Sequence, residues 1–248
     1  MVTERIAFFD VDYTICRCYT GFPTTFELIR RGIVKKRRIP VALGYRLGAV
    51  FHDGNIRKMY ETAVRDVAGS HVDDVSRIGR EIFESWVYPQ LYVDTLDEIQ
   101  RVRRDGARVV LISSGPDMVV RAVGEFVRAD AVYSNGPVVG ADGVLQSIVS
   151  EPLCHREGKL VLASAHARDA GVRLEDCAFY SDSSSDLPLM EAVGEAVAVN
   201  PDRRLRRIAR ERGWRVAEFR RTLGVRPPAR YASRTGVVVV GDTTATTD

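Results

Sequence analysis

Short apolar runs alternate with longer amphipathic stretches along this chain. Nearly continuous apolar runs, typical of strands buried on both faces, stand at residues 5–11 (RIAFFDV), 108–113 (RVVLIS) and 177–181 (CAFYS). Helical periodicity precedes the second and third runs, at about residues 93–104 and 159–170. Shorter strands are expected at residues 131–134, 196–200 and 214–218. Because strands that alternate with helices form βαβ units, the pattern predicts an α/β protein with a parallel sheet.

The stretch from residue 17 to residue 88 breaks this alternation. It contains no comparable strand run, and apolar residues recur there at spacings of three and four, as in residues 60–67. We therefore expect a helical cap, residues 17–88, inserted into an α/β core made of residues 1–16 and 89–225. Pro89 marks the expected return to the core.

Two further segments carry weaker signals. Residues 137–149 place Ala141-Asp142-Gly143 between two apolar runs, which predicts a β-hairpin appended to the sheet. After Arg226 the composition turns to Pro, Thr, Gly and Arg. Residues 226–248 are therefore expected to form a loosely held C-terminal tail, apart from one possible strand at residues 237–240.

Composition excludes several classes of protein. The chain has 248 residues, of which 45% are apolar, so it can bury a full core without disulfides or structural metals. Its four cysteines lack the paired spacing of a zinc site, and reduced thiols are expected. No apolar stretch approaches the ~20 residues that cross a bilayer, and the charged N-terminus does not resemble a signal peptide. We expect a cytoplasmic protein without a membrane partner.

The charge balance gives no sign of a nucleic-acid partner. A net charge of +3 is small, and basic residues would have to gather on one face to bind nucleic acid. The run Lys35 to Arg38 is the candidate patch, and a solvated helix end is the simpler interpretation of it. Contact of this run with substrate or a partner stays open.

Acidic residues follow two of the predicted strands. Asp10, Asp12 and Thr14 come directly after the first apolar run, where an extended backbone points all three side chains to one side. Asp182 and Asp186 follow the third apolar run. Because parallel strands bind ligands at their carboxyl ends, these acids are expected to converge. Two carboxylates about 4 Å apart repel by about 4 kcal/mol at an effective dielectric constant of about 20, and a bound Mg²⁺ removes that cost.

Each acid also has a structural interpretation, as a cap or a turn former. Asp186 precedes Leu187-Pro188, a favourable helix start, so its side chain can serve as an N-cap as well as in a site. For the acids taken together, a metal site is the better explanation.

A phosphate site is expected beside these acids. The second strand ends in Ser113-Ser114-Gly115, and a helical pattern begins at Pro116. A hydroxyl and free backbone N–H groups at a helix N-terminus are groups that hold a phosphate. Lys159 opens another helix and can bring a positive charge to the same edge. Most lysines are solvated surface groups, so this interpretation of Lys159 depends on the neighbouring motifs.

These motifs together resemble a known family. The segment DVDYT at residues 10–14, Ser114, Lys159 and SDSSSD at residues 181–186 resemble the four motifs of the haloacid dehalogenase superfamily of phosphohydrolases. With a helical insertion after the first motif, the chain is similar to the branch that contains phosphoserine phosphatase. The resemblance spans residues 6–216 and implies a Rossmann-like parallel sheet core with an inserted α-helical cap.

The resemblance implies a role for each motif residue. Asp10 is the implied nucleophile that becomes an aspartyl phosphate, and Asp12 is the implied acid and base. The implied Mg²⁺ ligands are Asp10, the backbone carbonyl of Asp12, and Asp182, with Asp186 supporting them. The implied phosphate-binding groups are Ser114, the Gly115 N–H and Lys159.

The chain departs from the family pattern at two positions. Ser181 stands where the family has glycine before the fourth-motif aspartate. Tyr19 stands where phosphoserine phosphatases have a glutamate that meets the substrate ammonium, and a phenol cannot neutralise that charge. We expect Tyr19 and Phe22 to select the substrate, and Arg65 to correspond loosely to a cap arginine that meets a substrate carboxylate.

The sequence thus predicts a Mg²⁺-dependent phosphomonoesterase that acts on a small phosphorylated metabolite. Three alternatives stay open: phosphoserine phosphatase proper, a phosphotransferase that uses the same intermediate, and a non-catalytic phosphate-binding module. Neither the leaving group nor the oligomeric state is specified by any residue pattern.

Overall fold

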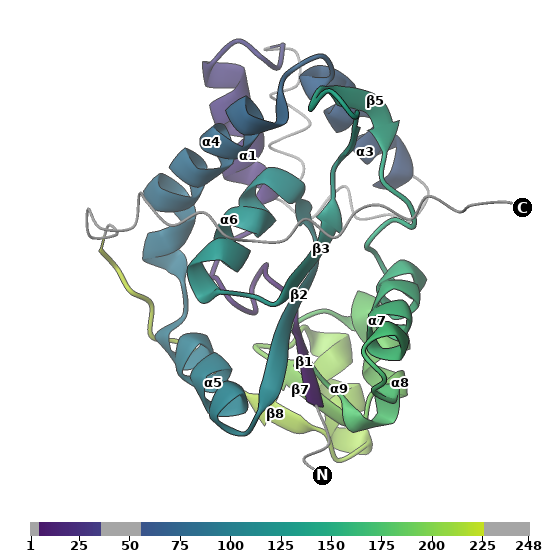
Figure 1. The fold of residues 1–248 in the computed structure, drawn as a ribbon. Coiled ribbons are helices and arrows are strands. Elements are labelled where there is room, and N and C mark those ends of the chain that lie inside the picture. Colours follow the sequence, from purple (N-terminus) through teal and green to yellow (C-terminus); the bar gives the residue numbers. More distant parts are fainter. Residues whose placement is uncertain (1–4, 36–55, 226–248) are drawn as a thin grey trace, which may run out of the picture.

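A computed structural model of the chain describes residues 5–35 and 56–225 (Figure 1). Its main sheet has the strand order β3-β2-β1-β6-β7-β8, and every neighbouring pair is parallel. The strands are β1 (Arg5–Phe9), β2 (Ala107–Pro116), β3 (Ala131–Asn135), β6 (Ala178–Ser181), β7 (Glu195–Val199) and β8 (Arg215–Ala217). The predicted α/β fold with a parallel sheet is confirmed.

Both faces of this sheet are buried, which explains the continuous apolar runs. In β1 the side chains of Ile6 and Phe8 enter one hydrophobic cluster, and those of Ala7 and Phe9 enter the other. A strand with two buried faces loses the apolar–polar alternation of a half-exposed strand. The apolar run at residues 5–11 is longer than the strand, because β1 ends at Phe9 and a turn begins at Val11.

Helices cover the two faces. They are α5 (Val93–Arg104), α6 (Asp117–Val127), α7 (Glu157–Asp169), α8 (Leu187–Ala192) and α9 (Arg203–Glu211), with short turns η4 (Leu174–Asp176) and η5 (Ser184–Asp186). Apolar residues of α5 and α6 share a cluster with Phe9, whereas those of α7, α8 and α9 share the other cluster with Phe8. The helix expected at residues 93–104 is confirmed, and the one expected at 159–170 lies at 157–169.

Between β1 and α5 the described chain is helical. It contains α1 (Gly21–Arg30), α3 (Ile56–Val67), α4 (Val72–Ile82), the π-turn η2 (Phe83–Val87) and η3 (Tyr88–Gln90). Helix α4 packs closely on α6, since a Cβ on Gly79 would lie 2.1 Å from the carbonyl oxygen of Met118. Helices α1, α3 and α4 lie with β5 at one end of the molecule, and α8 and α9 lie at the other (Figure 1).

The hairpin corrects one prediction. Strands β4 (Pro137–Val139) and β5 (Leu145–Val149) pair antiparallel, but they form a separate two-stranded sheet and do not extend the main one. The reason is that the apolar side of β5 is buried elsewhere: Val149 clusters with Tyr60 and Val64 of α3. The hairpin therefore belongs spatially with the helices that follow β1.

Some expectations concern residues outside the described part. These are the basic residues 36–38, the tail 226–248 and the strand expected at 237–240. Lys35, the first residue of the basic run, is exposed. Among the described helices, none is both long and apolar enough to span a bilayer.

Candidate active site

The candidate site lies where three neighbouring strands end. Asp10 directly follows β1, Asp182 directly follows β6, and Ser114 and Gly115 lie just before Pro116, the last residue of β2. Because these strands are parallel neighbours, their carboxyl ends meet at one edge of the sheet. The Asp10 N–H continues the ladder by donating a 2.9 Å hydrogen bond to the carbonyl of Tyr180, which fixes where its side chain starts.

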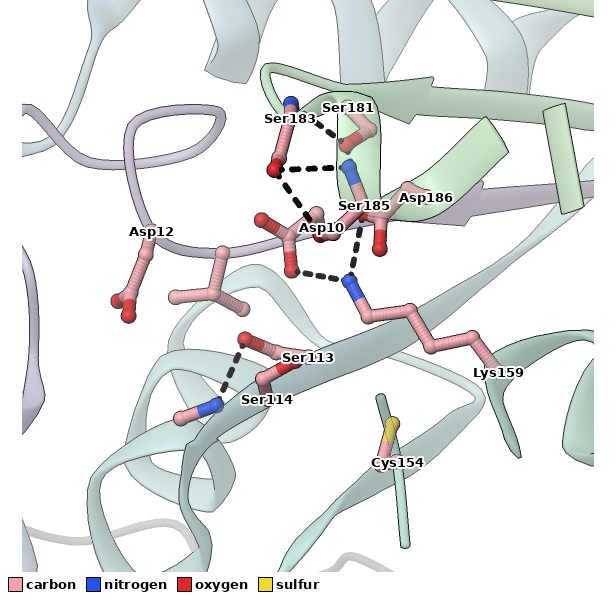
Figure 2. A network of polar contacts seen from close by, with 12 residues as sticks. Asp10, Asp12, Ser113, Ser114, Cys154, Lys159, Ser181, Ser183, Ser185 and Asp186 are labelled. Atoms are coloured by element: carbon pink, nitrogen blue, oxygen red, sulfur yellow. Dashed lines mark hydrogen bonds and ion pairs between the residues drawn. The ribbon is translucent and has the colours of Figure 1, made fainter. Parts of the chain in front are cut away.

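Lys159 brings a buried ammonium to this edge. Its Nζ lies 2.9 Å from Oδ1 of Asp10 and 2.7 Å from Oδ2 of Asp186, and its side chain is 2% exposed (Figure 2). Burial by itself lowers the pKa of Lys159, but the charges of the two carboxylates outweigh it and raise the pKa above its usual value. Lys159 is therefore a fixed cation that neutralises part of the acidic cluster.

The helix cap expected at Asp186 is not formed, although the residue lies in the candidate site. It stands at the N-cap position of α8, but its side chain makes no capping hydrogen bond. Its Oδ2 instead accepts from Lys159 and, at 2.6 Å, from the hydroxyl of Ser181. A buried ammonium is a stronger donor for a carboxylate than a neutral helix N–H. The carboxylate therefore pairs with Lys159 and not with the N–H groups at the start of α8.

The hydroxyl of Ser181 also accepts a 3.2 Å hydrogen bond from the N–H of Ser183. The serine that stands in place of the family glycine therefore links the first residues of the fourth motif to its last residue, Asp186. A glycine could not make this link, because it has no hydroxyl.

The pKa values of three of these acids are raised, because burial and like charges outweigh the positive charge near them. Burial, followed by the negative charge of Asp10, raises the pKa of Asp12 to about 7. Burial also raises the pKa of Asp182 well above its usual range, and the charges of Asp10 and Asp186 add to that effect. The pKa of Asp10 is likewise raised by burial, although Lys159 acts in the opposite direction. Four carboxylates around one ammonium leave an excess of negative charge.

This excess fits a divalent cation. The carboxylates of Asp10 and Asp182 and the backbone carbonyl of Asp12 are hard oxygen donors of the kind that Mg²⁺ prefers. No group of three or more His, Cys, Asp or Glu side chains in residues 5–35 and 56–225 forms a metal cluster. The expected donor set does not require one, because one of its three donors is a carbonyl. One oxygen of Asp186, Oδ1, is buried and has no hydrogen-bond partner among the described residues.

The segment after β1 turns sharply, which corrects the expected extended geometry. The carbonyl of Val11 accepts hydrogen bonds from the N–H groups of Thr14, Ile15 and Cys16, and Tyr13 has φ 56°. Thr14 therefore does not share the direction of Asp10 and Asp12. Its side chain is fully buried, and its carbonyl accepts a 2.6 Å hydrogen bond from the hydroxyl of Thr95. It orders the turn.

The candidate phosphate site shows partners that sequence reasoning missed. The Ser114 hydroxyl lies 3.4 Å from Nδ1 of His155, and the Tyr60 hydroxyl donates to the carbonyl of Ser114. The Gly115 N–H donates a 3.2 Å hydrogen bond to the hydroxyl of Ser113 (Figure 2). The strand expected to end at Ser113 continues to Pro116. Nothing local in the sequence indicates the contacts of Tyr60 and His155, since their partners are 54 and 41 residues away.

The three expected substrate-selecting residues have different surroundings from one another. Tyr19 folds back, so that a Cβ on Gly21 would lie 2.5 Å from its ring. Phe22 is half-buried and stacks on Phe26 with ring centroids 6.4 Å apart. The Arg65 side chain is 66% exposed and lies 3.9 Å from Glu61 on the same helix. Tyr60, on the buried face of that helix, contacts the site instead.

Sequence comparisons point to one family. The model of haloacid dehalogenase-like hydrolases matches residues 7–191. The inhibition of morphological differentiation protein of Streptomyces azureus is 31% identical over 220 residues, which is 87% of this chain and 78% of that protein. A probable phosphatase of Mycobacterium tuberculosis is 31% identical over 224 residues, which is 89% of this chain and 77% of that protein.

Solved structures show the same fold. A protein of unknown function from Bordetella pertussis Tohama I matches with a TM-score of 0.75 and 25% identity, covering 87% of this chain and 98% of that one. A phosphoserine phosphatase, solved as an analogue of its phospho-aspartyl intermediate, matches with a TM-score of 0.61 and 18% identity, covering 89% of this chain and 96% of that one. The second likeness concerns the fold alone.

Proposed function

This chain belongs to the family of haloacid dehalogenase-like hydrolases, and on that premise we propose that it is a Mg²⁺-dependent phosphatase of small phosphomonoesters. The observation that carries the proposal is the buried contact of Lys159 with both Asp10 and Asp186. An isolated buried ion cluster is costly to a fold, whereas a site for a phosphate dianion and a cation needs charges in this arrangement. The similar probable phosphatase of Mycobacterium tuberculosis supports the same activity.

In the proposed reaction Asp10 is the nucleophile. One of its carboxylate oxygens forms a bond to phosphorus while the bond from phosphorus to the ester oxygen breaks, and an aspartyl phosphate results. Asp12, protonated, gives its proton to the leaving oxygen and then takes a proton from the water that hydrolyses the intermediate. The pKa of about 7 for Asp12 suits a group that must both give and take a proton near neutral pH.

The other residues stabilise charge. Lys159 holds the Asp10 carboxylate and offsets the charge of the incoming phosphate. The Ser114 hydroxyl and the Gly115 N–H bind phosphoryl oxygens, which requires the Gly115 N–H to leave the Ser113 hydroxyl. Asp10, Asp182 and the carbonyl of Asp12 would hold Mg²⁺, with Asp186 supporting them. When bound, the cation supplies positive charge that lets a carboxylate approach a phosphate dianion.

The helices after β1 fit a cap. Residues 17–88 are proposed as the cap and residues 1–16 with 89–225 as the core, with the hairpin β4–β5 packing on α3 of the cap. A cap over the strand ends excludes water and selects the leaving group. The proposed selectors are Tyr19, which precedes α1, and Phe22 in its first turn.

The proposal is tested with purified protein and a panel of phosphorylated amino acids, sugars and alcohols. Phosphate release should require Mg²⁺ and should be abolished in Asp10→Asn, while Asp73→Asn, whose side chain is 88% exposed, should match the wild type. Acid quenching during turnover of a ³²P-labelled substrate should leave label on the wild type and none on Asp10→Asn. Mg²⁺-dependent turnover by Asp10→Asn contradicts the assignment.

The same panel separates the alternatives. Phosphoserine as the preferred substrate indicates phosphoserine phosphatase proper, which the substitution of Tyr19 for the family glutamate disfavours. Diversion of the phosphoryl group to an added alcohol indicates a phosphotransferase. Binding of Mg²⁺ and phosphate without turnover of any ester indicates a phosphate-binding module.

A further inference from the structure

Thr20 is a fully buried residue that none of the motifs includes. It precedes α1, it is 0% exposed, and its N–H donates a 3.0 Å hydrogen bond to Oδ1 of Asp12. Its own carbonyl accepts from the N–H of Thr24 at 3.3 Å and from the Thr24 hydroxyl at 2.8 Å. The Thr20 backbone is thus fixed to the first turn of α1, and Asp12 is held by it.

The hydroxyl of Thr20 is enclosed as well. Its Oγ1 is buried and has no hydrogen-bond partner among the residues the structure describes. A buried hydroxyl without a partner is unfavourable, so such a group in a site indicates a partner that arrives or moves. This hydroxyl faces the end of β2, because a Cβ on Gly115 would lie 2.8 Å from it. It is therefore enclosed between Asp12 and the candidate phosphate loop.

We propose that Thr20 is a positioning residue for Asp12, with its N–H and its hydroxyl both donating to that carboxylate so that the other oxygen faces the ester oxygen. This inference rests on the proposed function, in which Asp12 protonates the leaving group. The Thr20 N–H already lies 3.0 Å from Oδ1 of Asp12, which places this residue next to the carboxylate. Glycine at position 115 leaves the space in which the hydroxyl can turn.

Proton transfer from Asp12 makes the rate depend on the leaving group. As the bond from phosphorus to the ester oxygen breaks, the proton of Asp12 moves to that oxygen, and no other reagent is needed. A poor leaving group depends on this transfer, whereas an acidic phenol leaves with little help. Misplacing Asp12 should therefore slow poor leaving groups more than good ones.

The experiment compares aryl phosphates of similar size, 4-methylphenyl, phenyl and 4-nitrophenyl phosphate, in wild type and Thr20→Val. We expect kcat/KM of Thr20→Val to fall on the order of 10²-fold for 4-methylphenyl phosphate and by only a few-fold for 4-nitrophenyl phosphate. Thr20→Ser, which keeps the hydroxyl, should restore the wild-type dependence on the leaving group. Thr25→Val is the matched control, since its hydroxyl bonds to the Gly21 carbonyl in the same helix.

An equal loss for all three esters overturns the inference, because a merely structural defect does not depend on the leaving group. A Thr20→Ser variant as impaired as Thr20→Val overturns it too. If Thr20→Val does not fold, Thr20→Ala is compared in the same way, with thermal unfolding as the check. Failure of the proposed function gives a different result, namely a wild type that hydrolyses none of the esters.

Discussion

The hydroxyl of Tyr60 donates a hydrogen bond to the backbone carbonyl of Ser114. Tyr60 lies on α3, and Ser114 lies at the end of β2 beside the candidate phosphate site. Burial raises the pKa of Tyr60 well above its usual range, so the phenol stays protonated and remains a donor at any physiological pH. The contact ties α3 to the strand that presents Ser114.

Removing this hydroxyl should affect turnover without unfolding the protein. Tyr60→Phe loses one hydrogen bond to a backbone carbonyl, which is worth about 1 kcal/mol, so we expect a comparable loss in the free energy of unfolding. We also expect kcat/KM for the best substrate to fall about five-fold. Lys58→Gln, at an exposed position of α3, is the control and should change neither quantity. An unchanged kcat/KM in Tyr60→Phe would show that this contact does not position Ser114.

Lys159 should matter for both stability and chemistry. Lys159→Met leaves Asp10 and Asp186 buried without their cation, and breaking a buried ion pair on one side costs about 3–5 kcal/mol. Urea unfolding without Mg²⁺ should show this loss, and phosphate release should fall by on the order of 10²-fold or more. Lys58→Met, on an exposed position of α3, should behave like the wild type. A Lys159→Met variant as stable as the wild type would mean that the acids do not depend on this ammonium.

Binding of Mg²⁺ should be visible without any measurement of activity. Because the cation binds only the folded site, a hundredfold excess over Kd should stabilise the wild type by about 2.7 kcal/mol and raise Tm by several degrees. Asp182→Asn removes one proposed ligand and should lose most of this shift, whereas Asp73→Asn should keep it. Equal shifts in all three proteins would place the cation elsewhere.

The sequence predicts those features of the fold and the candidate site that depend on neighbouring residues or on the motifs. The apolar run at β1 predicts a strand buried on both faces, because that pattern is set by neighbouring residues, and the acids that follow it mark the edge of the sheet where the candidate site lies. The place of Lys159 at the same edge followed from the family resemblance, although Lys159 and Asp10 are 149 positions apart in the chain.

The errors arise where a distant partner outweighs a local preference. Asp186 was expected to serve as an N-cap as well as in the site, and its carboxylate pairs with Lys159 but makes no capping hydrogen bond. The positive φ of Tyr13 was not predictable, since tyrosine rarely adopts that conformation. The hairpin was assigned to the main sheet because its own pattern does not reveal that α3 buries Val149.

Glu98 on α5 lies away from the proposed chemistry, and its carboxylate contacts two arginines. Its Oε1 accepts from the Arg101 guanidinium at 2.9 Å and from the Tyr180 hydroxyl at 3.0 Å, and it also pairs with Arg215. Burial alone raises the pKa of Glu98, but the two guanidinium groups outweigh it and lower the pKa to about 2. The folded protein therefore favours the ionised form more than the unfolded chain does.

The sign of the pH dependence follows from this lowered pKa. The stabilisation is fully present above the unfolded value near 4.5 and is lost as the pH falls towards 2. At pH 7 we expect Glu98→Gln to lower the free energy of unfolding by about 1–3 kcal/mol, a range reduced because both arginines are partly exposed to solvent. Urea unfolding should show a constant difference between wild type and Glu98→Gln from pH 7 to about 5, which shrinks at lower pH. Glu211→Gln, from an exposed pair with Arg207, should cost less than about 0.5 kcal/mol at every pH. A difference that stays constant below pH 4 would contradict the lowered pKa of Glu98.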